Sequence, residues 1–305
     1  MRAELKGKLV GVLAGRVRFA VSLARYTSFR IGGPADAFIK PETLEELQTV
    51  ISLLHQEAIP FFVLGGGTNI LVSDKGVRGA VIKLGEGFKY THWKEGAETA
   101  SVAVGAGRSL GRFVREAVAK GYGGIEFAEG IPGSVGGGLL MNAGAFGGEL
   151  SHVVETITGV SQDGYVTCLT RKVLQFAYRS TVLPPGFIIA EIAFWLRRDR
   201  QANLVEAMER AQQKRQQTQP HGYPNAGSIF KNPPGAYAGQ LIEAVGLKGL
   251  RQGRAQVSEK HANFIVNTGG ASAAEVRCLM EQVQHLVWEK QQMWLEPEVR
   301  LVGEW

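Results

Sequence analysis

Three short stretches of the sequence combine residue types that could move a proton or stabilise a charge. Arg179 lies between an aromatic residue and a hydroxyl residue, Ser228 follows a glycine and precedes Ile-Phe-Lys-Asn, and Glu298 is the second of two closely spaced carboxylates. Each stretch also has a purely structural interpretation, as a surface cation, a turn residue and one half of an ion pair with Arg300. Composition alone leaves both interpretations open for all three.

Glycine is the unusual component, because it makes up 40 of the 305 residues, nearly twice the usual share of about 7%. In the segment VLGGGTNI at residues 63–70, apolar residues flank three glycines whose N–H groups can turn toward one anion. A second segment, GIPGSVGGG at residues 130–138, continues to NAGA at residues 142–145 and allows backbone to lie against a flat ring or a diphosphate. Both loops are predicted to hold a phosphate-bearing ligand, and a flexible connector is the alternative for the first.

The common nucleotide-binding motifs are absent from the sequence. There is no G-x-G-x-x-G fingerprint and no P-loop, so a nucleotide cofactor would need a different scaffold. One G-x-S-x-G pattern occurs at residues 107–111, between a predicted strand and a predicted helix, which is the context of a serine hydrolase nucleophile. Ser109 could equally cap the helix.

The net charge of +6 arises entirely in the first thirty residues. A nucleic-acid-binding protein usually spreads basic residues over its folded surface, so this distribution does not indicate one. The first thirty residues hold one acid, Glu4, and seven basic residues: Arg2, Lys6, Lys8, Arg16, Arg18, Arg25 and Arg30. Cys168 and Cys278 lack partner motifs and the six histidines are scattered, which favours a reducing compartment and no metal site. No apolar run suits a signal peptide or a membrane span, so we expect a cytoplasmic protein.

Periodicity predicts an α+β chain with a boundary near residue 200. Thr43, Ser109 and Ser272 are expected to cap helices, and residues 1–25 to form a leading helix or arm. Strands are expected at residues 35–40, 61–64, 70–72, 80–84, 100–104, 153–161, 165–169, 187–196, 262–266 and 298–302. Further helices are expected at residues 199–218 and 238–245. The division is a β-rich unit at residues 1–199 and a smaller α+β unit at residues 200–305.

Eight motifs in order make the chain resemble the UDP-N-acetylenolpyruvoylglucosamine reductase (MurB) family. They are YTSFRIGGPA at 26–35, LGGGTNILVSD at 64–74, GIPGSVGG at 130–137, NAGAFGGEL at 142–150, YRST at 178–181, NAGSIFKNP at 225–233, SEKHANFIVN at 258–267 and LEPEVRLVG at 295–303. The resemblance implies an FAD-binding domain of the vanillyl-alcohol-oxidase type at residues 1–199, followed by a substrate-binding domain at residues 200–305.

The chemistry implied by the resemblance is hydride transfer from NADPH to FAD and then to UDP-N-acetylglucosamine enolpyruvate, which yields UDP-N-acetylmuramate for peptidoglycan. Ser228 matches the proton donor, and Arg179 and Glu298 match the groups that stabilise the enediolate. The residues implied to bind the cofactor are Gly65, Gly66, Gly67, Thr68, Asn69, Ile70, Ile131, Pro132, Gly133, Ser134, Gly137, Asn142, Gly144 and Ala145. Those implied to contact the UDP-sugar are Arg215, Lys231, Asn232 and His261.

One departure concerns the loop after YRST, where only residues 181–186 precede the next strand. The chain therefore resembles the short-loop, second type of the family, which lacks a long loop with a covering tyrosine. Tyr223 or Tyr237 could help to cover the uracil instead. The expected partners are NADPH and the nucleotide sugar, without nucleic acid or membrane, and the expected state is a monomer. A flavin oxidase on the same scaffold and a non-catalytic nucleotide-sugar binder are the alternatives.

Overall fold

The computed structural model describes residues 3–13 and 15–305, and its chain forms two compact units. The first unit comprises residues up to Phe19, Ala37–Gly66 and Gly79–Lys214. The second comprises Ala20–Asp36, Gly67–Arg78 and Arg215–Trp305. Arg2, one of the seven basic residues near the N-terminus, lies outside the described residues. The triple glycine at residues 65–67 is therefore divided, with Gly67 in the second unit.

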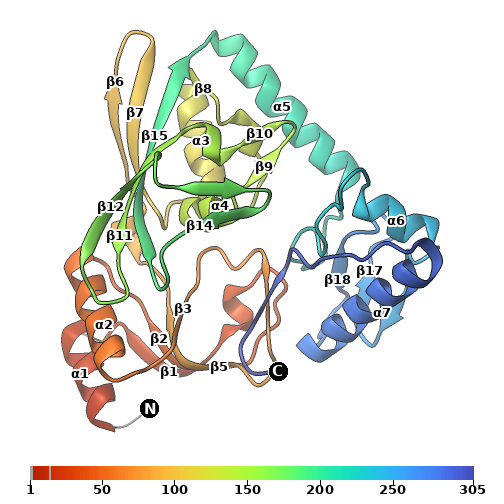
Figure 1. The fold of residues 1–305 in the computed structure, drawn as a ribbon, viewed down its shortest axis with the longest axis horizontal. Coiled ribbons are helices and arrows are strands. Elements are labelled where there is room, and N and C mark those ends of the chain that lie inside the picture. The colour runs from red at the N-terminus through yellow and green to blue at the C-terminus, as the bar shows by residue number, and fades with distance from the viewer. Residues whose placement is uncertain (1–2, 14) are drawn as a thin grey trace. The chain divides into compact units, whose positions relative to one another are not determined.

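The N-terminal part begins with α1 (Ala3–Leu13), so the predicted leading segment is a helix followed by a strand. A four-stranded sheet has the order β1-β2-β5-β3 (Figure 1), with β1 (Val17–Ser22), β2 (Pro34–Ile39), β5 (Val77–Ile82) and β3 (Phe61–Val63). Helix α2 (Leu44–Gln56) begins after Thr43, whose side chain accepts a hydrogen bond from the Glu46 amide as the capping spacing predicts. Its apolar face is buried.

The first unit is built on an antiparallel sheet in which the long strand β15 (Ile188–Arg198) is central (Figure 1). The sheet order is β12-β11-β15-β7-β6, and β8 also pairs with β15. The other strands are β12 (Val166–Thr170), β11 (Val154–Val160), β7 (Thr99–Gly105), β6 (Thr91–Glu95) and β8 (Tyr122–Gly123). Helix α3 (Leu110–Ala119) buries its apolar face in the same core, where the Phe113 and Phe194 rings lie 5.1 Å apart.

The glycine-dense segment folds into short elements rather than a disordered loop. Helix α4 (Val135–Leu140) begins after Ser134, whose hydroxyl accepts a hydrogen bond from the Gly137 amide. Two small hairpins belong to the same unit: β9 (Gly144–Ala145) with β10 (Gly148–Glu149), and β13 (Gln175–Ala177) with β14 (Ser180–Val182). Helix α4 and strand β14 lie side by side (Figure 1).

The second unit packs two helices against a small sheet. Helices α6 (Ala238–Ala244) and α7 (Ala273–Gln291) accompany β16 (Arg251–Gln252), β17 (Ala255–Val257) and β18 (Ile265–Asn267). A separate parallel pair joins β4 (Ile70–Val72) to β19 (Arg300–Val302). The carboxylate of Asp74 accepts hydrogen bonds from the first amides of α7, which ties the chain after β4 to that helix.

Helix α5 (Gln201–Thr218) contains the point at which the two units divide, between Lys214 and Arg215. Short 3-10 turns complete the fold: η1 (Leu23–Tyr26), η2 (Glu86–Phe88), η3 (Glu126–Ala128) and η4 (Leu150–His152). Within residues 3–13 and 15–305, no helix combines the length and apolar character needed to cross a membrane.

Candidate active site

The two glycine loops predicted to hold a ligand meet within the first unit. A Cβ atom built on Gly66 would lie 2.5 Å from the Cα of Gly133, and one on Gly65 would lie 2.8 Å from the Ser134 hydroxyl. Real Cβ atoms essentially never approach other atoms so closely, so glycine at position 66 is required for the two backbones to touch, and glycine at position 65 leaves room for the Ser134 hydroxyl. Residues 65–66 and 133–134 therefore form one continuous backbone surface.

That surface presents hydrogen-bond donors. Among the described residues, no acceptor is found for the backbone N–H groups of Gly65, Gly66, Gly133 and Ser134. Lys83 lies beside them, because its Nζ donates to the Gly65 carbonyl over 2.7 Å. Burial lowers the pKa of this ammonium, with smaller contributions from Lys89 and Lys40. Backbone donors and a cation are the groups that bind a diphosphate.

The remaining residues of the first loop belong to the second unit. Gly67 has φ of +68°, in the left-handed region, and its carbonyl accepts a hydrogen bond from the Ser28 amide. Asn69 donates through Nδ2 to the carbonyl of Glu298 over 3.1 Å, and Ile70 is paired with Arg300 in the parallel ladder. Thr68 lies between Gly67 and Asn69 and is half-buried. One end of the predicted cofactor loop is thus bonded to the segment that carries a predicted catalytic residue.

The rest of the second loop surrounds α4. The amide of Ile131 donates to the Ala128 carbonyl, and Pro132 follows in an exposed position. The Gly137 amide donates to the hydroxyl of Ser134, which caps α4. Gly144 and Ala145 form β9, where a side chain on Gly144 would meet the Gly148 carbonyl at 2.7 Å.

Asn142 is distinct among these residues because its side chain is buried, at 1% exposure, and engaged in protein hydrogen bonds. Its φ is +40°.

Arg179 occupies the turn between β13 and β14 in the first unit. Its φ is +58°, which is uncommon for a residue with a long side chain. The guanidinium donates to the Gly144 carbonyl over 2.9 Å and lies 5.1 Å from the Tyr178 ring centroid. Glu149 is nearby: the Ser151 hydroxyl does most to hold its pKa below the usual range, and Asn142 and the Arg179 charge add to that effect.

Ser228 lies in the second unit on a segment held by backbone bonds. The preceding Gly227 has φ of +76°, and its amide donates to the Asn225 side chain. After Ser228, the Ile229 amide donates to the Asn263 carbonyl over 2.9 Å. The buried side chain of Asn263 also pairs with both the amide and the carbonyl of Phe230, at 3.0 and 2.8 Å. The serine is half-buried, and no hydrogen bond of its hydroxyl is found within the described residues.

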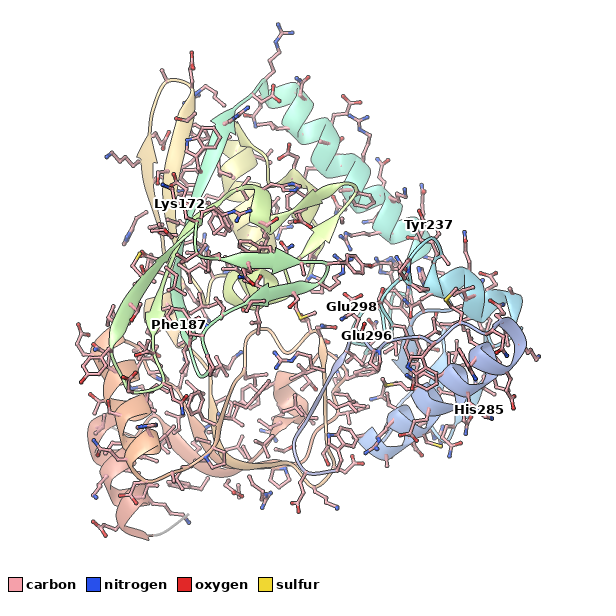
Figure 2. The ribbon with its side chains drawn as sticks, in the orientation of Figure 1. Lys172, Phe187, Tyr237, His285, Glu296 and Glu298 are labelled. Carbon is pink, nitrogen blue, oxygen red and sulfur yellow. The ribbon has the colours of Figure 1, made fainter. Side chains whose placement is uncertain are left out.

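Glu298 runs beside that segment in the same unit. Its amide donates to the Ile229 carbonyl over 2.7 Å, and Phe230 forms an antiparallel bridge with Pro297. Figure 2 shows Glu296 and Glu298 on the stretch that leads into β19. The structure therefore brings Ser228 and Glu298 onto adjacent backbones, while Arg179 belongs to the other unit.

The four residues predicted to contact substrate all lie in the second unit. Lys231 forms an ion pair with Glu296, and the Asn232 side chain accepts a hydrogen bond from the Ala238 amide at the start of α6. Arg215 lies on α5. His261 accepts a hydrogen bond at Nδ1 from the Asn263 amide, and burial does most to lower its pKa. The neutral ring therefore carries its proton on Nε2.

Other features found in the sequence have structural explanations. Ser109 caps α3 by accepting a hydrogen bond from the Arg112 amide, at 3.5 Å, which is the alternative interpretation of the G-x-S-x-G pattern. Both cysteines are free thiols, and the described residues contain no group of metal-ligating side chains. Tyr223 and Tyr237 are more than half exposed. Lys83 and Asn263 are the residues of interest that the sequence did not single out, because their partners are distant in the chain.

Comparison with known proteins agrees with this geometry. Residues 35–169 match a family model described as an FAD binding domain, and residues 219–302 match the C-terminal domain of UDP-N-acetylenolpyruvoylglucosamine reductase. The chain is 48% identical over 290 residues to UDP-N-acetylenolpyruvoylglucosamine reductase 2 of Symbiobacterium thermophilum, covering 95% of this chain and 93% of the relative. The reductase of Caldanaerobacter subterraneus subsp. tengcongensis is 42% identical, with both chains fully covered.

The chain belongs to the UDP-N-acetylenolpyruvoylglucosamine reductase (MurB) family. The solved structure of the MurB enzyme from Thermus caldophilus matches with a TM-score of 0.82 and 38% identity, covering 93% of this chain and 98% of that chain. These matches confirm the predicted family, the α+β fold class with its FAD-binding and reductase C-terminal domains, and an FAD-dependent enzyme of peptidoglycan synthesis. They also exclude the serine hydrolase interpretation.

The residues described above fit FAD. Gly65, Gly66, Gly133 and Ser134 offer backbone donors, and Lys83 adds a cation next to them. A Cβ on Gly66 would fill the place where the two loops touch, so the surface depends on glycine at this position. Such a surface suits an anionic diphosphate with a flat ring system.

Proposed function

We propose that this protein reduces UDP-N-acetylglucosamine enolpyruvate to UDP-N-acetylmuramate, with NADPH as the hydride donor. Family membership supports the reaction, and the observation that carries the site assignment is the pairing of the Ser228 and Glu298 segments. The Glu298 amide binds the Ile229 carbonyl, so an alcohol and a carboxyl group are held on neighbouring backbones in one unit. In the net reaction, a hydride from NADPH and one proton add across the double bond of the enolpyruvyl ether, which gives a lactyl ether and NADP⁺.

Under this proposal, three side chains act on the substrate. The Ser228 hydroxyl donates the proton to the substrate carbon that does not receive hydride. A serine is a weak acid, so it can act only because the enediolate carbon is strongly basic. Arg179 offers a cation, and Glu298 in its acid form offers a hydrogen bond, to the carboxylate on which negative charge develops.

FAD, when bound, supplies the hydride-transfer chemistry that no amino-acid side chain offers. Gly65, Gly66, Gly133 and Ser134 bind its diphosphate through backbone N–H groups, and Lys83 neutralises part of the charge. Gly67, Thr68, Asn69 and Ile70 complete the first loop, and Ile131, Pro132, Gly137, Gly144 and Ala145 complete the second. Residues 1–199 are assigned to cofactor binding and residues 200–305 to substrate binding.

The UDP-sugar is assigned to Arg215, Lys231, Asn232 and His261. Lys231 and Arg215 are cations suited to a diphosphate, and the Nε2–H of neutral His261 is a donor. Lys231 lies three residues after Ser228, which places a phosphate-binding charge close to the proton donor. We assign the protein to the cytoplasm, as a monomer, where the free thiols of Cys168 and Cys278 stay reduced.

An anaerobic titration of the purified protein tests the function. NADPH should bleach the flavin absorption near 450 nm at about one equivalent per FAD, and the enolpyruvyl sugar should then restore it with formation of UDP-N-acetylmuramate. Flavin that is reduced but reoxidised only by oxygen, with peroxide as the product, would instead support a flavin oxidase. Binding of the UDP-sugar without NADPH oxidation would support a non-catalytic binder.

A further inference from the structure

The turn that carries Arg179 is fastened to one neighbouring segment from both sides. Before the turn, the Ala177 carbonyl accepts a hydrogen bond from Asn142 Nδ2 over 3.2 Å. After it, the Thr181 hydroxyl donates to the Leu139 carbonyl. The Arg179 guanidinium itself binds the Gly144 carbonyl. All these groups belong to the first unit, so residues 139–144 hold the hairpin at three points.

The backbone of the turn indicates that this fastening is needed. Arg179 has φ of +58° and Asn142 has φ of +40°, in the left-handed region that L-residues adopt only at a cost, which is lower for asparagine than for arginine. Such conformations persist when surrounding bonds determine them. Asn142 is buried to 1% exposure and Thr181 to 6%, so both side chains are largely shielded from water, and the bond from Thr181 to Leu139 is itself buried.

The side-chain amide of Asn142 is engaged in hydrogen bonds through both its oxygen and its nitrogen. Its Oδ1 accepts from the Ser151 amide over 3.0 Å, which fixes the orientation of the amide and directs Nδ2 toward the hairpin. This use of the side chain differs from the cofactor contact that the family resemblance implies for Asn142.

We propose that Asn142, supported by Thr181, is a positioning residue that places the Arg179 guanidinium for the reaction. The proposal rests on the proposed role of Arg179 in stabilising charge on the substrate. Asn142 touches neither cofactor nor substrate in this assignment and acts through the backbone of the turn. A misplacement of about 1 Å at a reacting group can lower a rate by up to about 100-fold.

A double-mutant cycle in the holoenzyme tests this. Asn142→Gly removes the side chain while glycine accepts the left-handed backbone. Stopped-flow reoxidation of prereduced flavin by the enolpyruvyl sugar should slow about tenfold in Asn142→Gly, with flavin reduction by NADPH and the Kd for FAD within about twofold of the parent. In an Arg179→Gln background, the same change should have less than about a twofold effect, because its target is gone.

The outcomes separate the two hypotheses. If Arg179→Gln reoxidises at the parent rate, the proposed role of Arg179 fails, and the positioning role fails with it. If Arg179→Gln is slow but Asn142→Gly adds the same factor in both backgrounds, or raises the Kd for FAD, only the positioning role is wrong.

A second pair of variants covers the case in which Asn142→Gly does not fold. Thr181→Val keeps the shape of the side chain but removes its bond to the Leu139 carbonyl, and should slow reoxidation about fivefold. Thr181→Ser keeps the hydroxyl and should react like the parent. Hydrogen exchange should increase at the amides of residues 175–182 in Thr181→Val while α4 stays protected. Equal rates for the two variants would contradict the proposal.

Discussion

Two regions of the molecule use different parts of the chain. The glycine loops of the first unit offer backbone groups, whereas the Ser228 and Glu298 segments of the second unit offer side chains. Gly65 and Gly66 lie against Gly133 and Ser134 and have no room for side chains of their own. Around Ser228, the backbone is bonded to Asn263 and to the Glu298 stretch, and the side chains remain to do chemistry. An added atom should therefore disrupt the first region sterically, whereas the second region should tolerate a changed side chain and lose only its reaction.

The largest effect is expected for Ser228→Ala. The hydroxyl has no protein hydrogen bond among the described residues, so its removal should leave the fold and the bound flavin unchanged. Reoxidation of reduced flavin by the enolpyruvyl sugar should slow on the order of 10³-fold, the contribution of a positioned general acid. Stopped-flow absorbance resolves the two half-reactions. Loss of FAD in this variant would contradict the expectation that the Ser228 region tolerates a changed side chain. A rate equal to the parent's would show that Ser228 is not the proton donor.

Gly66→Ala is expected to act through cofactor binding instead. Its Cβ would lie 2.5 Å from the Cα of Gly133, so the two loops must separate. We expect a loss of about 1–3 kcal/mol in the free energy of unfolding and a rise of about 100-fold in the Kd for FAD, equivalent to about 2.7 kcal/mol. Flavin content and calorimetry measure both quantities.

Gly11→Ala is the matched control, because a Cβ there meets nothing within 4 Å. It lies in α1 and should keep the parent's flavin content while gaining up to about 1 kcal/mol of stability. If Gly66→Ala binds FAD like Gly11→Ala, the close contact between the loops is not part of the cofactor site.

Local features of the fold could be predicted from sequence because their causes lie within a few residues. Thr43, Ser109 and Ser272 cap helices as expected, since each side chain binds an amide three residues later. Strand β6 was not predicted, because four of its five residues, THWKE, are polar and three are exposed. Strand β17 was missed because three buried residues carry no periodic signal.

The site was predictable in part. Motifs identified the glycine loops and the three polar stretches, but sequence could not show that Asn263 holds the Ser228 segment from 33 residues away. Nor could it show that Lys83 reaches the Gly65 carbonyl, because that bond depends on the packing of β5 beside β3. The division of the triple glycine between two compact units is likewise a property of the fold.

Lys83→Met tests the comparison further, because it should weaken FAD binding while it stabilises the FAD-free protein. Burial lowers the pKa of Lys83, so its charged form is a cost to the folded state at every pH below the unfolded value of about 10.4. Removing the charge should therefore raise the melting temperature of the FAD-free protein. The Kd for FAD should rise about tenfold through loss of the cation near the diphosphate.

Lys89→Met serves as the control for Lys83→Met. Lys89 is also basic and close in sequence, but its side chain is 41% exposed and paired with Glu86, so its removal should change stability by less than about 1 kcal/mol. Fluorescence titration with FAD compares the variants. Equal affinities for Lys83→Met and the parent would limit Lys83 to a structural role.

The smallest effect is expected from His261, and it concerns pH. Burial lowers the pKa of this ring in the folded state, and its Nδ1 accepts a hydrogen bond from the backbone amide of Asn263, whose carbonyl and side chain hold the Ser228 segment. The unfolded chain therefore binds the proton more tightly, and the stabilisation present above about pH 6.5 is lost as the pH falls below that value. Urea unfolding should show a decline of about 1 kcal/mol between pH 7 and pH 5 that is absent in His261→Gln. Since Asn263 holds both histidine and serine segments, the reoxidation rate of the parent should fall over the same pH range, and a rate that is flat there would separate His261 from the placement of Ser228.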